Sequence, residues 1–391
     1  MRRRALLVCV LLLLPACQAT APPKALVVVS APLTAQPWVG RFLERGAKLA
    51  AAQLDSVRIV VRDNGGSPQT AVAIARQAVR DGAVALVMDG VGARAVAKVT
   101  DPARLAVFIA FEGGASLIDA KEAPSLFRLA PANRYLCRRL ADYLADTRPG
   151  LAVGVISDDS TYGREGAARV TADLLHDEVE VASEQTVPER AREVGAQVLA
   201  ARRDGAEVLV VWAKAAGVAA VVKAARSTGW QVPVYAGPSA ADPLVRQQLG
   251  DRPEWVEGLT FVSFRITSET GPAPFAAYRG AYEHAYGRDG IGVRAGGKEV
   301  VVPPDWSTYS YDAVKLVAAA LEHAGEASPG KVLEALQAVS ITGANGDERG
   351  FGPDDREGVS PDDIYFARFT DMRFVPVTDD KLSTNLPVVP Q

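Results

Sequence analysis

Residues 25–62 decide the fold, and they read ALVVVSAPLTAQPWVGRFLERGAKLAAAQLDSVRIVVR. The Val-rich run 25–30 is short and continuously apolar, which is typical of a strand buried within a parallel sheet. Residues 39–54 place apolar side chains at helical spacing, and residues 57–62 return to a strand pattern. A strand, a helix and a second strand in this order predict a βαβ unit, because parallel strands need a long crossover connection.

The same alternation continues in two separate series. The first series adds a helix, a strand, a helix and a strand over residues 68–111. After a pause at 127–131, the second series has predicted strands at 152–157, 180–186, 207–212 and 232–236, with helices that start near Tyr162, Glu189, Gly217 and Asp242. Two βαβ series in one chain predict an α/β protein with two doubly wound lobes.

Beyond Gly258 the regular alternation gives way to a mixture of elements. The predicted elements are a strand at 259–264, helices at 275–286, 311–324 and 331–339, a surface loop at 287–304, and a hairpin over 364–377 that turns at 370–372. This region therefore does not continue the regular βαβ alternation.

Composition and charge exclude several classes of protein. The 391 residues include 43 Lys and Arg against 46 Asp and Glu, a formal net charge of -3. No basic excess exists to bind a nucleic-acid backbone, so nucleic acid is not an expected partner. With 3 Cys and 3 His, each isolated from the others, neither a metal site nor a disulfide framework is predicted, and no cofactor is expected. Cys137 lies among apolar residues at helical spacing and is predicted to be a small buried core residue.

The N-terminal residues are predicted to direct export rather than to join the fold. Arg2, Arg3 and Arg4 form a positive segment, and residues 5–14 form an apolar run. This run is too short to cross a membrane, so it is typical of a signal peptide. No other apolar stretch is long enough to span a bilayer.

The apolar run ends in Leu14-Pro15-Ala16-Cys17, which resembles the lipobox of bacterial lipoproteins. The resemblance implies a signal peptide at residues 1–16, lipidation of the Cys17 thiol and a lipid-anchored tether at 17–24. The alternative is ordinary signal-peptidase cleavage after Ala21, although Pro22 would then occupy a position which that protease tolerates poorly.

Several short segments carry a family resemblance. They are Ala31-Pro32-Leu33-Thr34 with Gly40 and Gly46–Ala50, Asp63 with Pro68 and Ala71–Val79, Phe127-Arg128, Asp158–Arg164, Tyr311-Asp312-Ala313, and Gly346–Gly358 around Phe351. In this order they resemble the extracytoplasmic solute-binding proteins of branched-chain amino-acid ABC transporters. The resemblance covers nearly the whole chain after residue 24.

The resemblance implies a type 1 periplasmic binding protein, a clamshell of two lobes joined by three crossing strands. By analogy, the first lobe would comprise 25–131 and 260–345, and the second 132–259 and 346–391. A small-molecule ligand would lie between the lobes, at carboxyl ends of strands where helix N-termini present free N–H groups. Closure about the hinge would bury the ligand and create the form that a permease recognises. The implied protein is an extracytoplasmic, membrane-anchored monomer with ABC permease subunits as partners.

The positions that the resemblance assigns to the ligand are Trp38 or Val39, Gly92, Ala93, Gly113, Gly114, Tyr162, and Ser239 with Ala240. Tyr162 matches the family, whereas Gly92-Ala93 replaces a Ser that holds a carboxylate and Gly113-Gly114 replaces an Ala-Thr pair. Ser239 stands where the family has an acidic residue that neutralises an α-amino group. A buried ammonium without a partner is costly, so Leu, Ile and Val are expected to bind weakly. A carboxylate with an apolar or aromatic body, stacked on Trp38 and Tyr162, is the preferred ligand.

Three charged side chains are further ligand candidates. Glu112 closes a predicted strand, Lys214 follows another, and Asp242 stands at a helix start. The alternative for each is a solvated surface charge or a helix cap, and Asp242 before Pro243 is well suited to cap a helix.

Two other functions are compatible with parts of the sequence. Gly90-Val91-Gly92-Ala93-Arg94-Ala95 follows a predicted strand and fits G-x-G-x-x-A, with Glu112 at the end of the next strand, as in a nucleotide-binding enzyme. However, these glycines follow the third strand of the chain rather than the first, and no nucleophile, phosphate-loop or zinc motif accompanies them, so an enzyme is not predicted. A ligand-sensing clamshell for a receptor is the other alternative, because its physics is identical to that of a transport protein.

Overall fold

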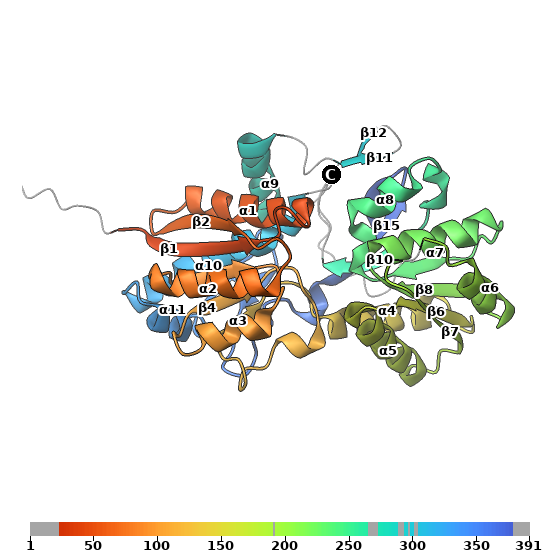
Figure 1. Cartoon of the computed structure of the whole chain (residues 1–391), viewed down its shortest axis with the longest axis horizontal. Coiled ribbons are helices and arrows are strands. Elements are labelled where there is room, and N and C mark those ends of the chain that lie inside the picture. Colours follow the sequence, from red (N-terminus) through yellow and green to blue (C-terminus); the bar gives the residue numbers. More distant parts are fainter. Residues whose placement is uncertain are drawn as a thin grey trace, which may run out of the picture.

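The computed structural model describes residues 23–377, except 191, 265–272, 288–292, 296–297 and 301–303. The predicted signal peptide, Cys17 and the last residues, 378–391, therefore lie outside the described residues. Figure 1 shows two lobes side by side, each built on a sheet with helices on its faces. This arrangement confirms the predicted α/β class with two lobes.

The first lobe contains a parallel sheet of five strands in the order β2-β1-β3-β4-β5. The strands are β1 (Ala25–Ala31), β2 (Val57–Asp63), β3 (Ala85–Met88), β4 (Ala106–Ile109) and β5 (Leu126–Arg128). All residues of β1, β3, β4 and β5 are buried. Burial on both faces explains why these strands have continuous apolar sequences rather than alternating ones.

Helices cover both faces of this sheet. They are α1 (Pro37–Ala52), α2 (Pro68–Arg80), α3 (Ala93–Thr100), α10 (Thr308–Ala324) and α11 (Pro329–Ala335), with the 3-10 turns η1 (Ala115–Leu117) and η4 (Pro304–Ser307). A further helix, α9 (Ala273–Tyr286), packs on the outside of α1. Alternate residues of β1 point to opposite faces: Val27 and Val29 pack with residues of α1 and α10, whereas Leu26 and Val28 pack with α2 and α3. The side chains of β1 thus contribute to two separate hydrophobic clusters, one on each face of the sheet.

The second lobe contains a sheet of seven strands in the order β16-β15-β10-β9-β8-β6-β7. The strands are β6 (Val153–Asp158), β7 (Val181–Val187), β8 (Val208–Trp212), β9 (Val234–Ala236), β10 (Thr260–Phe264), β15 (Ile364–Thr370) and β16 (Arg373–Pro376). The first five are parallel, and β15 and β16 form the predicted antiparallel hairpin at one edge.

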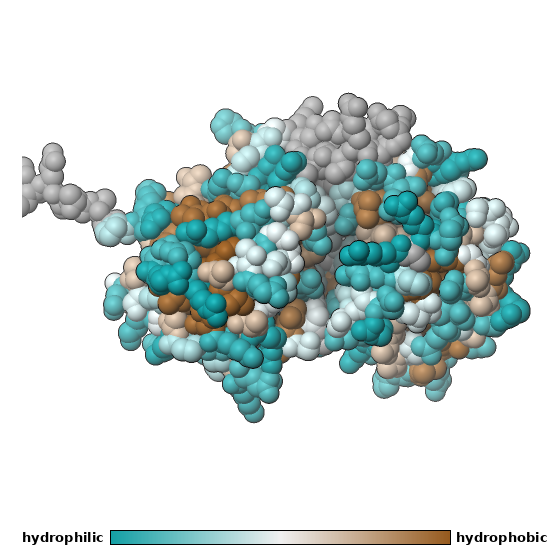
Figure 2. All heavy atoms as spheres, viewed as in Figure 1, coloured by the Kyte–Doolittle hydropathy of each residue, from teal (hydrophilic) through white to brown (hydrophobic). Residues whose placement is uncertain are grey.

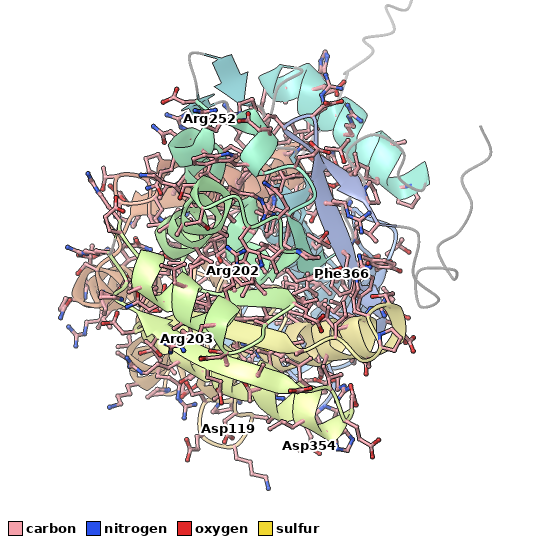
Figure 3. The ribbon with its side chains drawn as sticks, turned by 90° about the vertical axis from the view of Figure 1, so that its right-hand side faces the viewer. Asp119, Arg202, Arg203, Arg252, Asp354 and Phe366 are labelled. Atoms are coloured by element: carbon pink, nitrogen blue, oxygen red, sulfur yellow. The ribbon has the colours of Figure 1, made fainter. Side chains whose placement is uncertain are left out.

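Helices also flank the second sheet. They are α4 (Asn133–Thr147), α5 (Thr161–His176), α6 (Gly195–Arg203), α7 (Ala215–Ser227) and α8 (Pro243–Leu249), with the 3-10 turns η2 (Pro238–Ala241), η3 (Pro253–Trp255) and η5 (Pro361–Asp363). Figure 3 views this lobe end-on, with Arg202 and Arg203 on its outer surface. Cys137 on α4 is fully buried as predicted, and burial raises the pKa of its thiol well above the ordinary value. Among the described helices, none has the length and apolar character needed to cross a membrane.

Short elements account for several errors of the sequence prediction. Residues 293–295 and 298–300 pair as β11 (Val293–Ala295) and β12 (Lys298–Val300), in a region predicted to be a loop. The predicted helix 331–339 is too long: α11 ends at Ala335, and β13 (Ser340–Thr342) pairs with β14 (Glu348–Gly350) soon afterwards. Strands of three residues are too short to show an alternating pattern, so periodicity cannot reveal them.

The predicted helix start near Glu189 is also wrong, because α6 begins at Gly195. The Asp159 carboxylate accepts a hydrogen bond from the N–H of Glu189 at 2.7 Å, and the Glu189 side chain pairs with Lys214 at 2.5 Å. These contacts hold Glu189 in a loop, and they come from segments distant in sequence.

The chain passes between the lobes next to a hinge made of paired backbone. Arg128, at the end of β5, forms a parallel bridge with Glu357 on a later crossing segment. The N–H of Arg128 donates to the carbonyl of Arg356 at 2.8 Å, and Gly358 donates to the carbonyl of Arg128 at 2.7 Å. Residues 265–272, which follow β10, lie outside the described residues.

Two of the predicted lobe boundaries need correction. Residues 260–264 were assigned to the first lobe, but they form β10, which pairs with β9 and β15 in the second sheet. Residues 348–350 were assigned to the second lobe, but they form β14, which pairs with β13 next to α10. Hydrogen bonding between strands decides which sheet a strand belongs to. The order of elements along the chain does not specify that pairing.

Candidate ligand site

The two sheets direct the carboxyl ends of their parallel strands toward each other. The first lobe contributes the loops after β3 and β4, and the second lobe contributes the loops after β8 and β9. The space-filling view shows the surface hollowed between the lobes (Figure 2). Such an edge is where open α/β sheets bind ligands, because loops and helix N-termini converge there.

After β3, the chain turns through Gly90 and Gly92 into α3, whose first residue is Ala93. The Glu112 side chain packs over Gly90: a Cβ on Gly90 would lie 2.4 Å from the Cβ of Glu112. Gly90 also has a φ of 125°, which favours glycine. The close approach of Glu112 thus accounts for Gly90 without a nucleotide phosphate.

Two neighbouring carboxyl groups lie below this turn. Asp89 is 6% exposed and accepts a hydrogen bond from the side-chain amide of Asn64 at 3.0 Å, and burial raises its pKa to about 6. Glu112 is exposed to water, but protein surrounds it closely enough that desolvation raises its pKa, and the charge of Asp89 raises it further. The opposing charge of Lys214 reaches Glu112 from the second lobe. In the described part of the chain, no group of three or more His, Cys, Asp and Glu side chains is arranged to hold a metal ion.

Asp89→Asn is expected to stabilise the protein at pH 7.5 and to leave its stability unchanged near pH 4. Because the folded-state pKa of Asp89 is about 6, ionisation of this group costs stability progressively as pH rises from about 4 to about 6, by about 3 kcal/mol in total. An Asn side chain carries no charge and so avoids this cost, and its carbonyl oxygen can still accept the hydrogen bond from the Asn64 amide. Urea unfolding at the two pH values measures the effect, and an equal change at both would exclude ionisation as its cause.

The loop after β4 contains Gly113 and Gly114, and its carbonyl groups are anchored at the hinge. The carbonyl of Gly113 accepts a hydrogen bond from the N–H of Asn133 at 2.7 Å. The carbonyl of Gly114 accepts one from Nη1 of Arg128 at 2.6 Å. The loop is therefore tied both to the start of α4 and to the crossing strand.

In the second lobe, Tyr162 packs on Trp212, with ring centroids 6.1 Å apart and planes inclined by 34°. Its hydroxyl lies beside Ser239, and burial raises the pKa of Tyr162. The Ser239 hydroxyl donates to the carbonyl of Ala213, and the Lys214 ammonium pairs with Glu189 at 2.5 Å. Ser239 and Lys214 thus lie at the expected edge of the sheet but already have partners in their own lobe.

Asp242 and Trp38 meet across the two lobes. The Asp242 carboxylate accepts a hydrogen bond from the N–H of Leu244 at 2.8 Å, so the predicted cap of α8 is confirmed. Desolvation raises the pKa of Asp242, while the Leu244 N–H and the indole of Trp38 on α1 act in the opposite direction. Trp38 and Tyr162 lie in different lobes, and each packs on aromatic rings of its own lobe.

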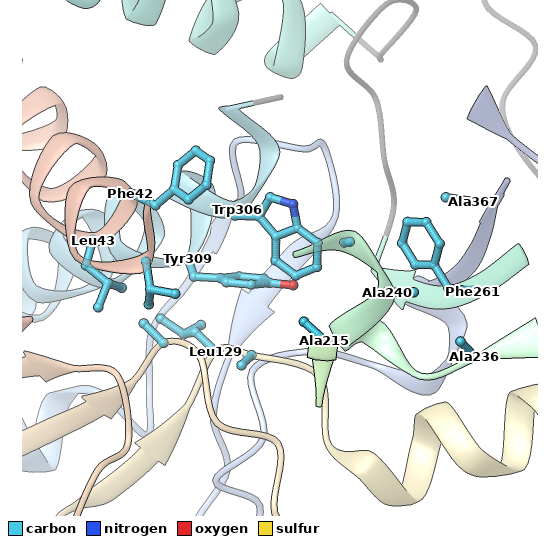
Figure 4. Packing of buried hydrophobic residues seen from close by; sticks show 14 of the residues in the cluster. Phe42, Leu43, Leu129, Ala215, Ala236, Ala240, Phe261, Trp306, Tyr309 and Ala367 are labelled. Carbon is cyan, nitrogen blue, oxygen red and sulfur yellow. The ribbon is translucent and has the colours of Figure 1, made fainter. Parts of the chain in front are cut away.

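An aromatic wall, which we define as Trp38, Phe111, Trp306 and Tyr309, forms the first-lobe side of the site. Trp38 meets Phe111 edge-on at 5.6 Å and Trp306 at 6.3 Å, and Trp306 meets Tyr309 at 6.5 Å. Trp306 and Tyr309 belong to the same buried cluster as residues of the second lobe and extend toward it (Figure 4). Neither residue is among the predicted site residues, and the only sequence signal for them is their position just before the Tyr311-Asp312-Ala313 segment.

A cavity of about 520 Å³ lies on the hinge side of the molecule. Its lining includes Tyr135, residues 337–340, Phe351 and residues 357–361. It contains none of the candidate ligand residues from the loops after β3, β4, β8 and β9, so it is separate from the site between the lobes.

Comparisons with known proteins identify the family and the fold. The family model described as "Periplasmic binding protein" matches residues 31–374. A periplasmic binding protein type 1 from Bordetella pertussis is similar in structure, with a TM-score of 0.77 and 18% identity over 91% of this chain and 100% of that chain. A comparison with curated protein sequences finds no match.

Two further solved structures carry ligand names in their descriptions. The branched-chain amino acid transporter substrate-binding protein of Streptococcus pneumoniae, in complex with isoleucine, has a TM-score of 0.75 and 18% identity over 91% of this chain and 100% of that chain. A leucine-binding protein of Thermotoga maritima has a TM-score of 0.74 and 16% identity over 90% of this chain and 97% of that chain. At 16–18% sequence identity, the similarity to these structures shows a shared fold and nothing about the ligand.

Proposed function

Because this chain belongs to the periplasmic binding protein family, we propose that it captures a small ligand between its lobes and delivers it to an ABC permease. The observation that carries the proposal is the convergence of four strand-end loops, two from each lobe, on one interlobe site. The alternative of an enzyme lacks a comparable constellation among the described residues. The proposed protein is an extracytoplasmic, lipid-anchored monomer without a cofactor or catalytic residues.

The proposed ligand is a small carboxylate or an amino-acid-like molecule. The relatives from Streptococcus and Thermotoga are described with isoleucine and leucine, which carry a carboxylate and an apolar body. The aromatic wall suits an apolar body, and the Gly113–Gly114 loop suits an anionic group. The residues proposed to form the site are Trp38, Gly92, Ala93, Glu112, Gly113, Gly114, Tyr162, Lys214, Ser239 and Asp242.

Mass spectrometry of small molecules released from the purified protein by denaturation tests this function. We expect a co-purified metabolite with a carboxylate group, present in a fixed ratio to the protein and bound again when added back. The same denatured extract from an unrelated exported protein, purified in the same way, is the control. A released nucleotide, or failure of any carboxylate or amino acid to shift the melting temperature, would contradict the proposal.

Lipid anchoring is proposed from Cys17, and Cys17→Ser is expected to abolish it. A Ser hydroxyl cannot form the thioether to diacylglycerol, so the precursor is expected to retain its signal peptide. Metabolic labelling with palmitate and gel mobility measure this result, with Cys137→Ser as the matched control that keeps normal labelling. Normal lipidation of the Cys17→Ser variant would refute the assignment.

A further inference from the structure

The guanidinium of Arg128 connects the hinge to the candidate ligand loop. The Arg128 side chain is 0% exposed, and its Nε donates to Oε2 of Glu357 at 2.7 Å. Nη2 donates to the other oxygen of the same carboxylate, while Nη1 donates to the carbonyl of Gly114 at 2.6 Å. The fork of this one side chain therefore holds a carboxylate on one crossing segment and a peptide of the loop after β4.

The hydrogen bonds to the carbonyl groups of Gly113 and Gly114 also determine where the neighbouring N–H groups point. In a planar trans peptide, the N–H points opposite to the C=O. The carbonyl of Gly113 points to Asn133, so the N–H of Gly114 points away from α4. The carbonyl of Gly114 points to Arg128, so the N–H of residue 115 points away from the hinge.

These N–H groups lie at the edge of the sheet that faces the second lobe. In the part of the chain that the structure describes, neither Gly114 nor Ala115 donates a backbone hydrogen bond to another protein group. Successive backbone N–H groups directed to one side form a concavity that receives an anion. Glu357 pairs with Arg128 through both carboxylate oxygens, and the positive charge of Arg128 also opposes the desolvation that raises the pKa of Glu112, next to the loop.

We propose that Arg128 is a positioning residue that holds the peptide between Gly114 and Ala115 in the orientation needed to bind a ligand carboxylate, beside the Gly113–Gly114 peptide that Asn133 anchors. The proposal rests on the function proposed above and assigns Arg128 no contact with the ligand. Because Glu357 lies on another crossing segment, the orientation of the loop is tied to the geometry of the hinge. The same side chain therefore contacts both the loop that binds the carboxylate and a segment that crosses between the two lobes.

Arg134 provides a matched control for Arg128. Its guanidinium also pairs with Glu357, at 3.3 Å, but its side chain is 40% exposed and has no hydrogen bond to the loop. Arg134→Met therefore removes a cation from the same carboxylate and leaves Gly114 anchored. Arg128→Lys keeps a positive charge near Glu357, but a single ammonium cannot reproduce the three donations of the guanidinium fork.

The test compares ligands that differ only in the anionic group. The probes are 4-methylpentanoate and leucine, each against its own amide, measured by titration calorimetry. The wild-type protein is expected to bind at least one acid more than 10-fold tighter than its amide. Arg128→Lys is expected to reduce this acid-to-amide ratio below 3, whereas Arg134→Met retains it. An equal loss of affinity for acid and amide in Arg128→Lys would show a merely structural role and overturn the proposal.

A measurement on the wild-type protein covers the case in which Arg128→Lys does not fold. With ¹⁵N-labelled alanine, the amide resonance of Ala115, whose N–H belongs to the peptide that Arg128 holds, is expected to move downfield on addition of the bound acid and to stay in place with its amide. An unmoved Ala115 resonance with both acids contradicts the inference. A tightly bound co-purified molecule without an anionic group would also overturn it, while leaving the proposed binding function intact.

Discussion

Gly46→Leu is expected to lower the free energy of unfolding by about 5 kcal/mol or to prevent folding, which makes it the most damaging single change considered. Gly46 lies in the middle of α1, where the helix crosses the start of α10. A Cβ at this position would lie 2.0 Å from the carbonyl oxygen of Ser307 and 2.3 Å from Oγ of Ser310. Because one of these atoms belongs to the backbone, a side chain fits only if α10 moves away from α1.

Gly280→Leu is the matched control for this variant. Gly280 lies inside α9, and a Cβ there would meet nothing within 4 Å. Leu favours helix formation over Gly, so this variant is expected to gain up to about 1 kcal/mol. Urea unfolding followed by circular dichroism compares the two variants. Similar losses in both would show that helix crowding is not the cause.

Glu357→Met is expected to cost about 4 kcal/mol of stability, because it leaves the charge of Arg128 buried without its carboxylate partner. The Arg128 side chain is 0% exposed, and that of Glu357 is 4% exposed. Arg134 also loses its partner and then adds a repulsive charge near Arg128. Chemical unfolding at pH 7 measures the loss as a shift of the midpoint.

The double variant Arg128→Met/Glu357→Met separates the cost of an orphaned charge from the loss of contacts. Replacing a whole buried pair by apolar side chains is often close to neutral, so this variant is expected to recover at least half of the stability lost in Glu357→Met. It is also expected to lose the preference for an acid over its amide. Simple additivity of the two single losses would contradict a coupled ion pair at the hinge.

The central strands β1, β3, β4, β6 and β8 could be predicted from sequence because they are buried on both faces. In such a strand nearly every residue is apolar, as in residues 25–31. The length of the apolar run then gives the length of the strand. The start of α6 and the short β13–β14 hairpin could not be predicted in this way, because contacts with Asp159 and pairing over three residues decide them. Local pattern carries no information about such tertiary contacts.

The site shows the same division between local and distant information. The loops after β3, β4, β8 and β9 follow from topology alone, since parallel strands end at one edge. The role of Arg128 depends on Glu357, which is 229 residues away. Trp306 and Tyr309 reach the site through the packing of α10 on α1. No spacing rule links these residues, so their place in the site had to come from the three-dimensional structure.

The packing of α1 on α10 also has a consequence for the order in which the chain can fold. Ser310 on α10 donates a hydrogen bond to the carbonyl of Phe42 on α1, across 268 residues of sequence. The face of the first sheet that carries Val27 and Val29 is therefore covered by α1 but lacks its second helix until α10 has been synthesised. The second sheet obtains most of its strands earlier, from one continuous stretch of chain. During synthesis, the nascent N-terminal half is expected to expose an apolar surface that favours aggregation. Contact between α1 and α10 must also bring together residues 268 positions apart, which is expected to limit the folding rate.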